Sequence, residues 1–236
     1  RISKVDNEAE LNSSLGTRAA QKALEMAGRR AEEIDQIIYA TCSPDTPLPS
    51  SACWLQQKIG AHRAWAMDIN AACSGFIYGA VTAEQFIRSG HSKTVLVIGA
   101  EVLSQYINWQ DRTICILFGD GAGAAVIERV GARSRQRILG SYLSSDGNLT
   151  RLLIVPAGGS ALEVTPEQTI TLVHRCITRV HVLVGCAEAK VLAQLVLRTC
   201  TNSVLSVERH GDRAVGIRYR RAVIGKPGRY RPHGIQ

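Results

Sequence analysis

The sequence predicts an α/β fold in which helices cover a largely parallel sheet. Strand-like apolar runs alternate with helix-compatible runs as far as about residue 167, the order expected of a layered α/β fold. One run, residues 93–100, is continuously apolar and therefore resembles a strand buried on both faces. The chain has 236 residues, 45% of them hydrophobic, so it can bury a sizeable core.

The elements expected over residues 15–69 follow from the periodicity of apolar residues and from the positions of glycine and proline. Residues 15–28 predict an amphipathic helix that ends at a glycine C-cap, and residues 34–41 predict a strand. Three prolines exclude regular structure from residues 43–49, so a loop is expected there. A helix over residues 51–59 and a buried strand over residues 64–69 come next.

Further elements are expected up to about residue 167, and the pattern then fails. Residues 75–89 predict a helix, and three strands are expected over residues 93–100, 122–129 and 137–144. Neither helical nor alternating periodicity holds across residues 171–197, and no regular structure is predicted for the Arg-, Gly- and Pro-rich end of the chain. We therefore expect a folded region over residues 1–168 and an atypical basic segment over residues 169–236.

Charge and cysteine usage exclude several classes of function. Residues 1–170 hold 16 basic and 17 acidic side chains, whereas residues 171–236 hold 12 basic and 3 acidic ones, so the net charge of +8 comes from the last segment. A nucleic-acid partner has no support in the folded region. No apolar run is long enough for a membrane span, and the N-terminus lacks both the apolar core of a signal peptide and an initiator methionine. The chain is thus expected to begin partway into something longer, with no membrane partner.

The seven cysteines show neither a C-x-x-C pair nor metal-ligand spacing with histidine. We therefore expect no metal site and no resident cofactor. Reduced thiols in a cytoplasmic protein are the simplest interpretation.

Cys73 is the first candidate functional residue. It follows the expected strand 64–69 and precedes the expected helix 75–89, at a junction where unpaired backbone N–H groups and the positive helix end can lower a thiol pKa and hold an oxyanion. Such a position suits a thiolate nucleophile. The alternative is a small buried cysteine packed beneath a helix.

A glycine-rich motif, Phe-Gly-Asp-Gly-Ala-Gly-Ala over residues 118–124, is the second candidate. Its alternate glycines would permit close backbone approach and unusual φ values. Its spacing is not that of G-x-G-x-x-G, and no lysine followed by Ser or Thr comes after it, so a phosphate-binding loop is not favoured.

Together these motifs resemble a known family. The string Ala-Ala-Cys-Ser-Gly-Phe around Cys73, Asp-Arg-Thr around Arg112 and the glycine motif are similar to β-ketoacyl-acyl-carrier-protein synthase III, a condensing enzyme of the thiolase superfamily. The resemblance runs from about residue 1 to about residue 167. It implies a thiolase-like layered αβα half-domain, truncated at its N-terminus, whose second half is incomplete or unrecognisable.

The resemblance also implies a reaction. Cys73 would take an acyl group from acyl-CoA, and a malonyl thioester on acyl carrier protein would lose CO2 and attack that acyl group, as at the start of fatty-acid synthesis. Arg112 matches the position that stacks on the CoA adenine, and Leu48 matches the one that closes the acyl pocket across a homodimer interface. Ordinary loop positions are the alternative for both residues.

The family's partners for decarboxylation are not found in the sequence. Neither a Pro-His-Gln-Ala-Asn-type nor a Gly-Asn-Thr-Ser-type motif occurs, and His174 and His181 lie in apolar surroundings that resemble nothing catalytic. Asp212 stands where a faint trace of the second motif would place asparagine. Two hypotheses therefore stay open: an impaired condensing acyltransferase, or an inactive remnant that binds acyl-CoA or dimerises.

Two interpretations of residues 169–236 also stay open. Charge balance and motif order change at the same boundary, and a shifted reading frame would change both. A genuine basic, disordered tail is the rival, although such tails are usually polar and residues 171–205 are strongly apolar.

Overall fold

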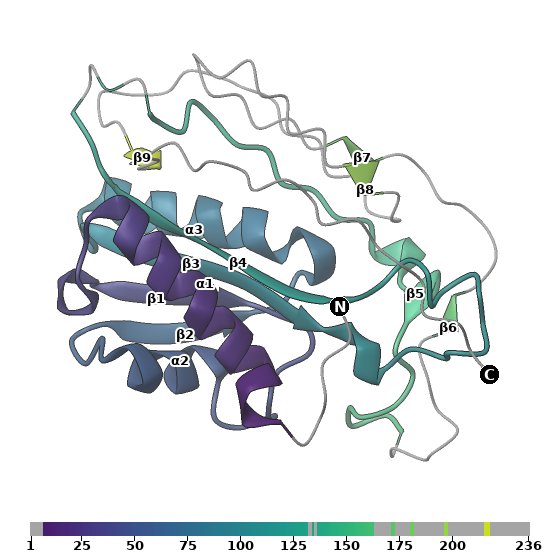
Figure 1. Cartoon of the computed structure of the whole chain (residues 1–236). Coiled ribbons are helices and arrows are strands. Elements are labelled where there is room, and N and C mark those ends of the chain that lie inside the picture. The colour runs from purple at the N-terminus through teal and green to yellow at the C-terminus, as the bar shows by residue number, and fades with distance from the viewer. Residues whose placement is uncertain are drawn as a thin grey trace, which may run out of the picture.

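The computed structural model describes residues 7–131, 134 and 136–162, together with the backbone of four short strands further along the chain (Figure 1). These strands are β6 (Thr171–Leu172), β7 (Val180–His181), β8 (Val196–Leu197) and β9 (Val215–Ile217). The rest of the atypical basic segment predicted over residues 169–236 lies outside the described residues.

A five-stranded sheet in the order β2-β1-β3-β4-β9 forms the centre of the fold. Strands β1 (Gln36–Ala40), β2 (Trp65–Ile69) and β3 (Thr94–Val102) are parallel, and β4 (Asp120–Arg129) runs antiparallel to β3. The remaining pairs are short: β9 pairs with the end of β4, β5 (Leu153–Ile154) with β6, and β7 with β8.

Helices cover both faces of this sheet, which is the αβα layering expected from the sequence (Figure 1). Helices α1 (Asn12–Ala27) and α2 (Ser51–Ile59) pack on one face, against Ile37 and Tyr39. Helix α3 (Gly75–Ser89) packs on the other face, against Ile38. All residues of β1 are buried, because alternating side chains point into a different core on each side.

Most of the predicted elements are confirmed. Helices α2 and α3 have the predicted bounds, and α1 ends before Gly28, whose φ of 63° is the left-handed conformation of a glycine C-cap. The loop over residues 43–49 is confirmed as well, and it contains a cis peptide bond between Leu48 and Pro49. Single-turn 3-10 helices fill several of the connections: η1 (Glu8–Glu10), η2 (Ala31–Glu33), η3 (Ala72–Ser74), η4 (Leu103–Gln105) and η5 (Gly147–Leu149).

Three sequence predictions are wrong. Residues 137–144 form no strand; Ile138 instead packs on the α3 side of the sheet, and the Ser144 carbonyl accepts a hydrogen bond from the Tyr78 hydroxyl at 3.2 Å. Strand β2 is half-exposed rather than buried, because it lies at the end of the sheet order. The glycines at 121 and 123 lie in strand β4 with open space around them, so neither close approach nor unusual φ explains them.

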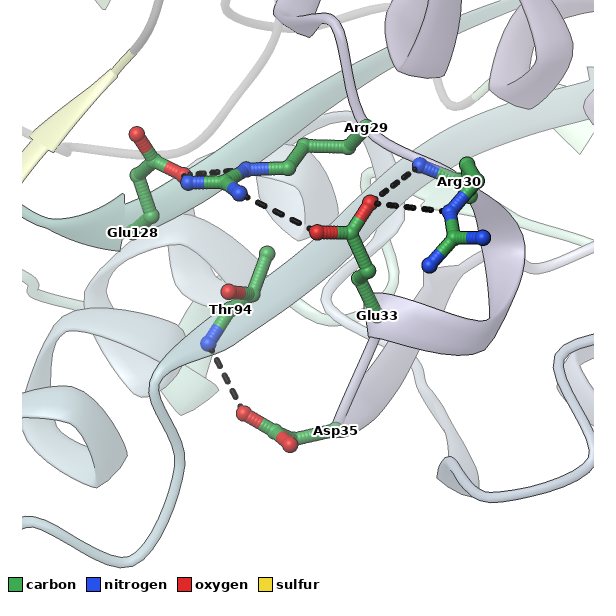
Figure 2. A network of polar contacts seen from close by, with 6 residues as sticks. All are labelled: Arg29, Arg30, Glu33, Asp35, Thr94 and Glu128. Atoms are coloured by element: carbon green, nitrogen blue, oxygen red, sulfur yellow. Dashed lines mark hydrogen bonds and ion pairs between the residues drawn. The ribbon is translucent and has the colours of Figure 1, made fainter.

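Polar contacts gather where the parallel strands begin, and they join the end of α1 to β4 and the start of β1 to the start of β3 (Figure 2). Arg29, just after α1, bonds Glu128 of β4 at 2.8 Å and Glu33 at 3.2 Å. Asp35 accepts hydrogen bonds from the backbone N–H groups of Lys93 and Thr94, at 2.8 and 3.0 Å. Structural contacts therefore occupy the end of the sheet where the parallel strands begin. The candidate site lies at the opposite end, where these strands finish.

Candidate active site

Three neighbouring parallel strands bring chemistry-bearing residues to one edge of the sheet. Cys42 comes just after β1, Cys73 lies in the turn after β2, and Glu101 is the second-last residue of β3. Because parallel strands end at the same edge, these three residues gather there, where α/β proteins usually place their binding sites. Strand β4 is antiparallel, so its first residue, Asp120, reaches this edge opposite Val102.

Cys73 lies in the single turn η3, directly before α3. The turn requires a positive φ of 46° at Ala72, whose N–H bonds the Asn70 side chain at 3.1 Å. At Gly75 an added Cβ would come within 3.0 Å of the Ala40 Cβ, so glycine allows α3 to begin close to β1. The strand–cysteine–helix junction predicted from the sequence is thereby confirmed, and Cys73 is exposed at its surface rather than packed beneath the helix.

The electrostatics of the Cys73 thiol differ from the sequence prediction. The Cys73 side chain reaches solvent, but the protein atoms around its sulfur reduce its hydration and raise its pKa, and the negative charge of Glu101 raises the pKa further. The backbone N–H of Cys73 itself acts in the opposite direction, but its effect is smaller. The helix terminus therefore does not lower the pKa of this thiol below its ordinary value here, because burial and a nearby carboxylate outweigh it.

Glu101 fixes the chain that leaves β1. Its carboxylate accepts hydrogen bonds from the Cys42 N–H at 3.0 Å, from the Thr41 hydroxyl at 3.3 Å and, over a short distance, from the Ser43 hydroxyl. Burial first, and then the charge of Glu101, raises the pKa of Cys42 to about 12. The pKa of Tyr106 is also raised, by burial and then by its two titratable neighbours, Cys42 and Glu101.

The buried side-chain amide of Asn12 joins the chain segments that lie below the candidate site. The Asn12 Nδ2 atom donates to the Ser43 carbonyl at 2.8 Å, to the Thr41 hydroxyl at 3.1 Å and to the Ala100 carbonyl at 3.1 Å. The Tyr39 hydroxyl donates to the Asn12 side-chain oxygen at 2.6 Å. Asn12 thus joins α1, β1 and β3 below the candidate site.

The glycine motif contributes its aspartate to the same edge. Asp120 accepts hydrogen bonds from the Ser104 N–H at 2.9 Å and from the Ser104 hydroxyl at 2.6 Å. These bonds hold the turn that follows β3 against the start of β4. The motif therefore forms the start of strand β4 at this end of the sheet, and it is not a phosphate loop ahead of a helix.

Leu48 and Arg112 lie on two separate loops. The Leu48 side chain is 85% exposed, so the described residues of one copy of the chain do not enclose it. Arg112 is exposed in a turn that Asp111 stabilises by accepting from the Thr113 N–H at 2.8 Å. Among the described residues, no hydrogen bond or ion pair joins Arg112 to Cys73.

The other sequence candidates fall in the part of the chain that the structure does not describe. His174 and Asp212 lie outside the described residues, as does the side chain of His181. Within the described part of the chain, no group of three or more His, Cys, Asp or Glu residues could hold a metal ion, and no helix has the length and apolarity to cross a bilayer. A cleft of about 600 Å³ lies elsewhere, between Asp45, Trp54 and Lys58.

Sequence reasoning missed Cys42 and Glu101 as partners of Cys73. The available signal was their place at the ends of predicted neighbouring strands, because parallel topology brings strand ends together. Only the strand order shows that β1 lies between β2 and β3, so that all three ends adjoin.

Comparison with known proteins finds similarity to the same family that the sequence motifs resemble. Residues 67–147 match the family model of 3-oxoacyl-[acyl-carrier-protein] synthase III. A β-ketoacyl-[acyl-carrier-protein] synthase III of Caldanaerobacter subterraneus is 48% identical over 171 residues, covering 72% of this chain and 51% of the relative. One of Clostridioides difficile is 50% identical over 167 residues, covering 71% of this chain and 50% of the relative.

Solved structures show the same likeness. The crystal structure of 3-oxoacyl-[acyl-carrier-protein] synthase III from Aquifex aeolicus superposes with a TM-score of 0.62 at 41% identity, over 73% of this chain and 51% of that one. The enzyme from Pseudomonas aeruginosa gives 0.62 at 31% identity, over 69% and 49%. The chain thus spans about half the length of the relatives that it matches.

Proposed function

Over its N-terminal region this chain belongs to the β-ketoacyl-acyl-carrier-protein synthase III family, and from this premise we propose that Cys73 accepts an acyl group from acyl-CoA. The observation that carries the proposal is the placement of an exposed cysteine in the turn between β2 and α3, inside the region matched by the family model. A covalent acyl-enzyme divides one difficult condensation into two easier steps.

The proposed step is a thioester exchange. The Cys73 sulfur attacks the acyl carbonyl, the carbon–sulfur bond to CoA breaks, and the thiol proton ends on the departing CoA sulfur. The step needs no oxidant, metal or resident cofactor, since one thioester replaces another. Because the pKa of Cys73 is raised, the thiolate that attacks is a minority species near neutral pH.

The condensing step is proposed to be impaired. In the family a malonyl group on acyl carrier protein loses CO2, and preorganised donors stabilise the resulting oxyanion, each contributing several kcal/mol. The two motifs that carry these donors do not occur in the sequence. The alternative is an inactive remnant that only binds acyl-CoA or dimerises, and an acyl-enzyme on Cys73 would distinguish the two.

Intact-protein mass spectrometry after incubation with hexanoyl-CoA tests the proposal. Wild-type protein should gain one hexanoyl group, and Cys73→Ser should not gain a hydroxylamine-labile thioester. Cys53→Ser is the matched control, because Cys53 is also an exposed cysteine in the first turn of a helix. A Cys73→Ser protein that still acquires the thioester would refute the assignment.

Arg112 is proposed to contact the CoA adenine. Its guanidinium is planar and exposed, so it can stack on a purine. Arg112→Ala should raise the acyl-CoA concentration needed for half-maximal acylation roughly three- to tenfold, since a cation–π contact contributes about 1 kcal/mol. The exposed Arg63→Ala is the control, and equal effects of the two changes would remove Arg112 from the site.

A homodimer is proposed through the open side of β2. Among the described strands β2 ends the sheet order, and none of its residues is fully buried although four of the five, Trp65, Ala66, Met67 and Ile69, are apolar. An unpaired strand edge of this kind favours pairing with another chain. Light scattering should give twice the mass of the chain, and a monomer at micromolar concentration would contradict this arrangement.

The compartment is proposed to be the cytoplasm. The four described cysteines, Cys42, Cys53, Cys73 and Cys115, are free thiols, and the thioester exchange requires a reduced Cys73.

A further inference from the structure

The loop that carries Leu48 is fastened at both of its ends by carboxylates. We call residues 41–50, between β1 and α2, the strap. At its beginning, Glu101 accepts from the Cys42 N–H at 3.0 Å and from the hydroxyls of Thr41 and Ser43. At its end, Asp68 of β2 accepts hydrogen bonds from the first two residues of α2.

Asp68 caps helix α2 from a different strand. Its two carboxylate oxygens accept hydrogen bonds from the backbone N–H groups of Ser51 and Ala52, both at 2.7 Å. Ser50 occupies the N-cap position, but its side chain makes no capping bond. Two of the backbone N–H groups that lack a partner within the first turn of α2 are therefore satisfied by Asp68, from a neighbouring strand.

In the middle of the strap, two side chains form hydrogen bonds with α1 and α2. Asp45 accepts from the Ser13 N–H at 3.1 Å, and the Thr46 hydroxyl accepts from the Trp54 indole N–H at 3.3 Å. Leu48 is the exception, since 85% of its surface stays exposed. This exposure leaves the Leu48 side chain free to contact an acyl chain bound in a second copy of the protein, the role that the family resemblance implies for it.

We propose that Asp68 is a positioning residue for acyl-chain selection, because its two bonds to the start of α2 fix the strap that presents Leu48. The inference rests on the proposed function, in which Cys73 is acylated in a homodimer. Asp68 also lies on the strand that leads to Cys73, so one strand carries both the residue that caps α2 and the approach to the proposed nucleophile.

An ordinary structural role for Asp68 is the alternative, and the chain offers a matched control for it. Asp35 likewise accepts from two consecutive backbone N–H groups, those of Lys93 and Thr94, but at the opposite edge of the sheet. Asp68→Asn and Asp35→Asn should therefore lose similar amounts of stability. Only Asp68→Asn should affect the strap.

Amide hydrogen exchange gives a readout that does not depend on activity. In Asp68→Asn the peptide covering residues 43–54 should exchange faster than in the wild type, and in Asp35→Asn it should not. Unchanged exchange of this peptide in Asp68→Asn would overturn the proposal, because the strap would then not depend on Asp68.

Self-acylation rates supply the selectivity test. The ratio of the rate with hexanoyl-CoA to the rate with acetyl-CoA should change on the order of tenfold in Leu48→Ala, the size expected for altered apolar contact with a chain. Asp68→Asn should shift the ratio in the same direction, and the double variant should shift it no further than Leu48→Ala alone. Asp35→Asn should leave the ratio unchanged.

The possible failures are distinguishable. If the wild-type protein takes up no acyl group from either substrate, the proposed function falls, and the inference about selection falls with it. If the wild type is acylated but Asp68→Asn keeps the wild-type ratio, the inference alone is overturned. A general loss of rate without a change in ratio would likewise assign Asp68 a purely structural role.

Discussion

At the scale of single residues, Glu101 connects the two cysteines of the candidate site. It holds the Cys42 backbone by a hydrogen bond and raises the pKa of both the Cys42 and the Cys73 thiols. The sequence could predict Cys73 because the residues around it form a contiguous motif. It could not predict the sign of the shift in pKa, since that shift depends on a carboxylate from another strand.

Glu101→Gln should make Cys73 more reactive toward iodoacetamide at pH 7.5. Removing the negative charge lowers the Cys73 pKa, so a larger fraction of the thiol is ionised at a given pH. Peptide mapping of alkylation rates across pH 6–10 should show the Cys73 profile displaced toward lower pH. Glu33→Gln, at the opposite edge of the sheet, should leave the profile in place, and slower alkylation in Glu101→Gln would contradict the electrostatic explanation.

Asn12→Ala should be strongly destabilising. Asn12 is almost fully buried and bonds the Ser43 and Ala100 carbonyls, the Thr41 hydroxyl and the Tyr39 hydroxyl. Since each buried group that loses its partner costs about 1–3 kcal/mol, the free energy of unfolding should fall by about 3 kcal/mol in urea titrations. The exposed Asn148→Ala should change it by less than about 0.5 kcal/mol.

At the scale of elements, local patterns were sufficient where an element carries its own signals. Helix α3 was predicted with its exact bounds because its apolar face and its terminal Gly90 are both local. The predicted strand over residues 137–144 failed because a strand needs a partner, and this segment packs against the α3 side of the sheet instead. The edge position of β2 depends on strand order, which no local pattern contains.

Gly16→Ala should destabilise α1 despite its better helix propensity. A Cβ at residue 16 would overlap the Tyr39 hydroxyl and come within 2.8 Å of two ring carbons. Tyr39 cannot move away freely, because it is fully buried and bonded to Asn12. An overpacking cost of about 1–3 kcal/mol should exceed the roughly 1 kcal/mol gained from propensity.

Thermal unfolding of Gly16→Ala in the wild-type and Tyr39→Phe backgrounds tests this cause. The penalty should be smaller in the Tyr39→Phe background, where the overlapping hydroxyl is gone. Exposed Gln21→Ala in the same helix should be neutral or slightly stabilising. A Gly16→Ala protein more stable than wild type would show that the helix can shift without cost.

Acid should weaken the contacts that Glu33 makes with Arg29 and Arg30, just after α1 (Figure 2). The pKa of Glu33 is lowered, first by the hydrogen bond from the Arg30 N–H and then by the charge and hydrogen bond of Arg29 and by the charge of Arg30. A carboxylate whose pKa is lower in the folded state stabilises that state above the unfolded pKa, near 4.5, and this stabilisation is lost as pH falls through the folded value.

Urea titrations between about pH 6 and pH 3 should therefore show a shallower acid loss of stability for Glu33→Gln than for the wild type. Glu32→Gln, which removes a neighbouring exposed carboxylate, is the matched control. An identical slope for Glu33→Gln and wild type would mean that Glu33 does not contribute.

At the scale of the whole molecule, the described region lacks cover for part of its apolar surface. Ile116 is 74% exposed and Leu117 56%, in the connection between β3 and β4 that also carries Arg112. Large apolar side chains side by side in solvent usually mark a surface that another part of a protein covers. The αβα layering was predictable from the order of elements, whereas this missing cover shows only in three dimensions.

The charge and motif boundary near residue 170 leads to a prediction about the encoding DNA. Acidic side chains fall from 17 in residues 1–170 to 3 in residues 171–236, and the family resemblance ends at about residue 167. Selection for a fold rarely loses charge balance and motif order at one point, but translation in a shifted frame loses both. A basic interaction tail explains the charge and leaves the apolar character of residues 171–205 unexplained.

We therefore expect the other two frames downstream of about codon 165 to encode strings similar to Pro-His-Gln-Ala-Asn and Gly-Asn-Thr-Ser. Sequencing of that DNA is the measurement, and the absence of both strings from both frames would reject the shifted frame. If the strings are found, a chain translated in the restored frame should decarboxylate malonyl-acyl carrier protein orders of magnitude faster than the present chain, since it regains the oxyanion donors. It should also bind less of a hydrophobic dye, because a second half-domain would then cover Ile116 and Leu117.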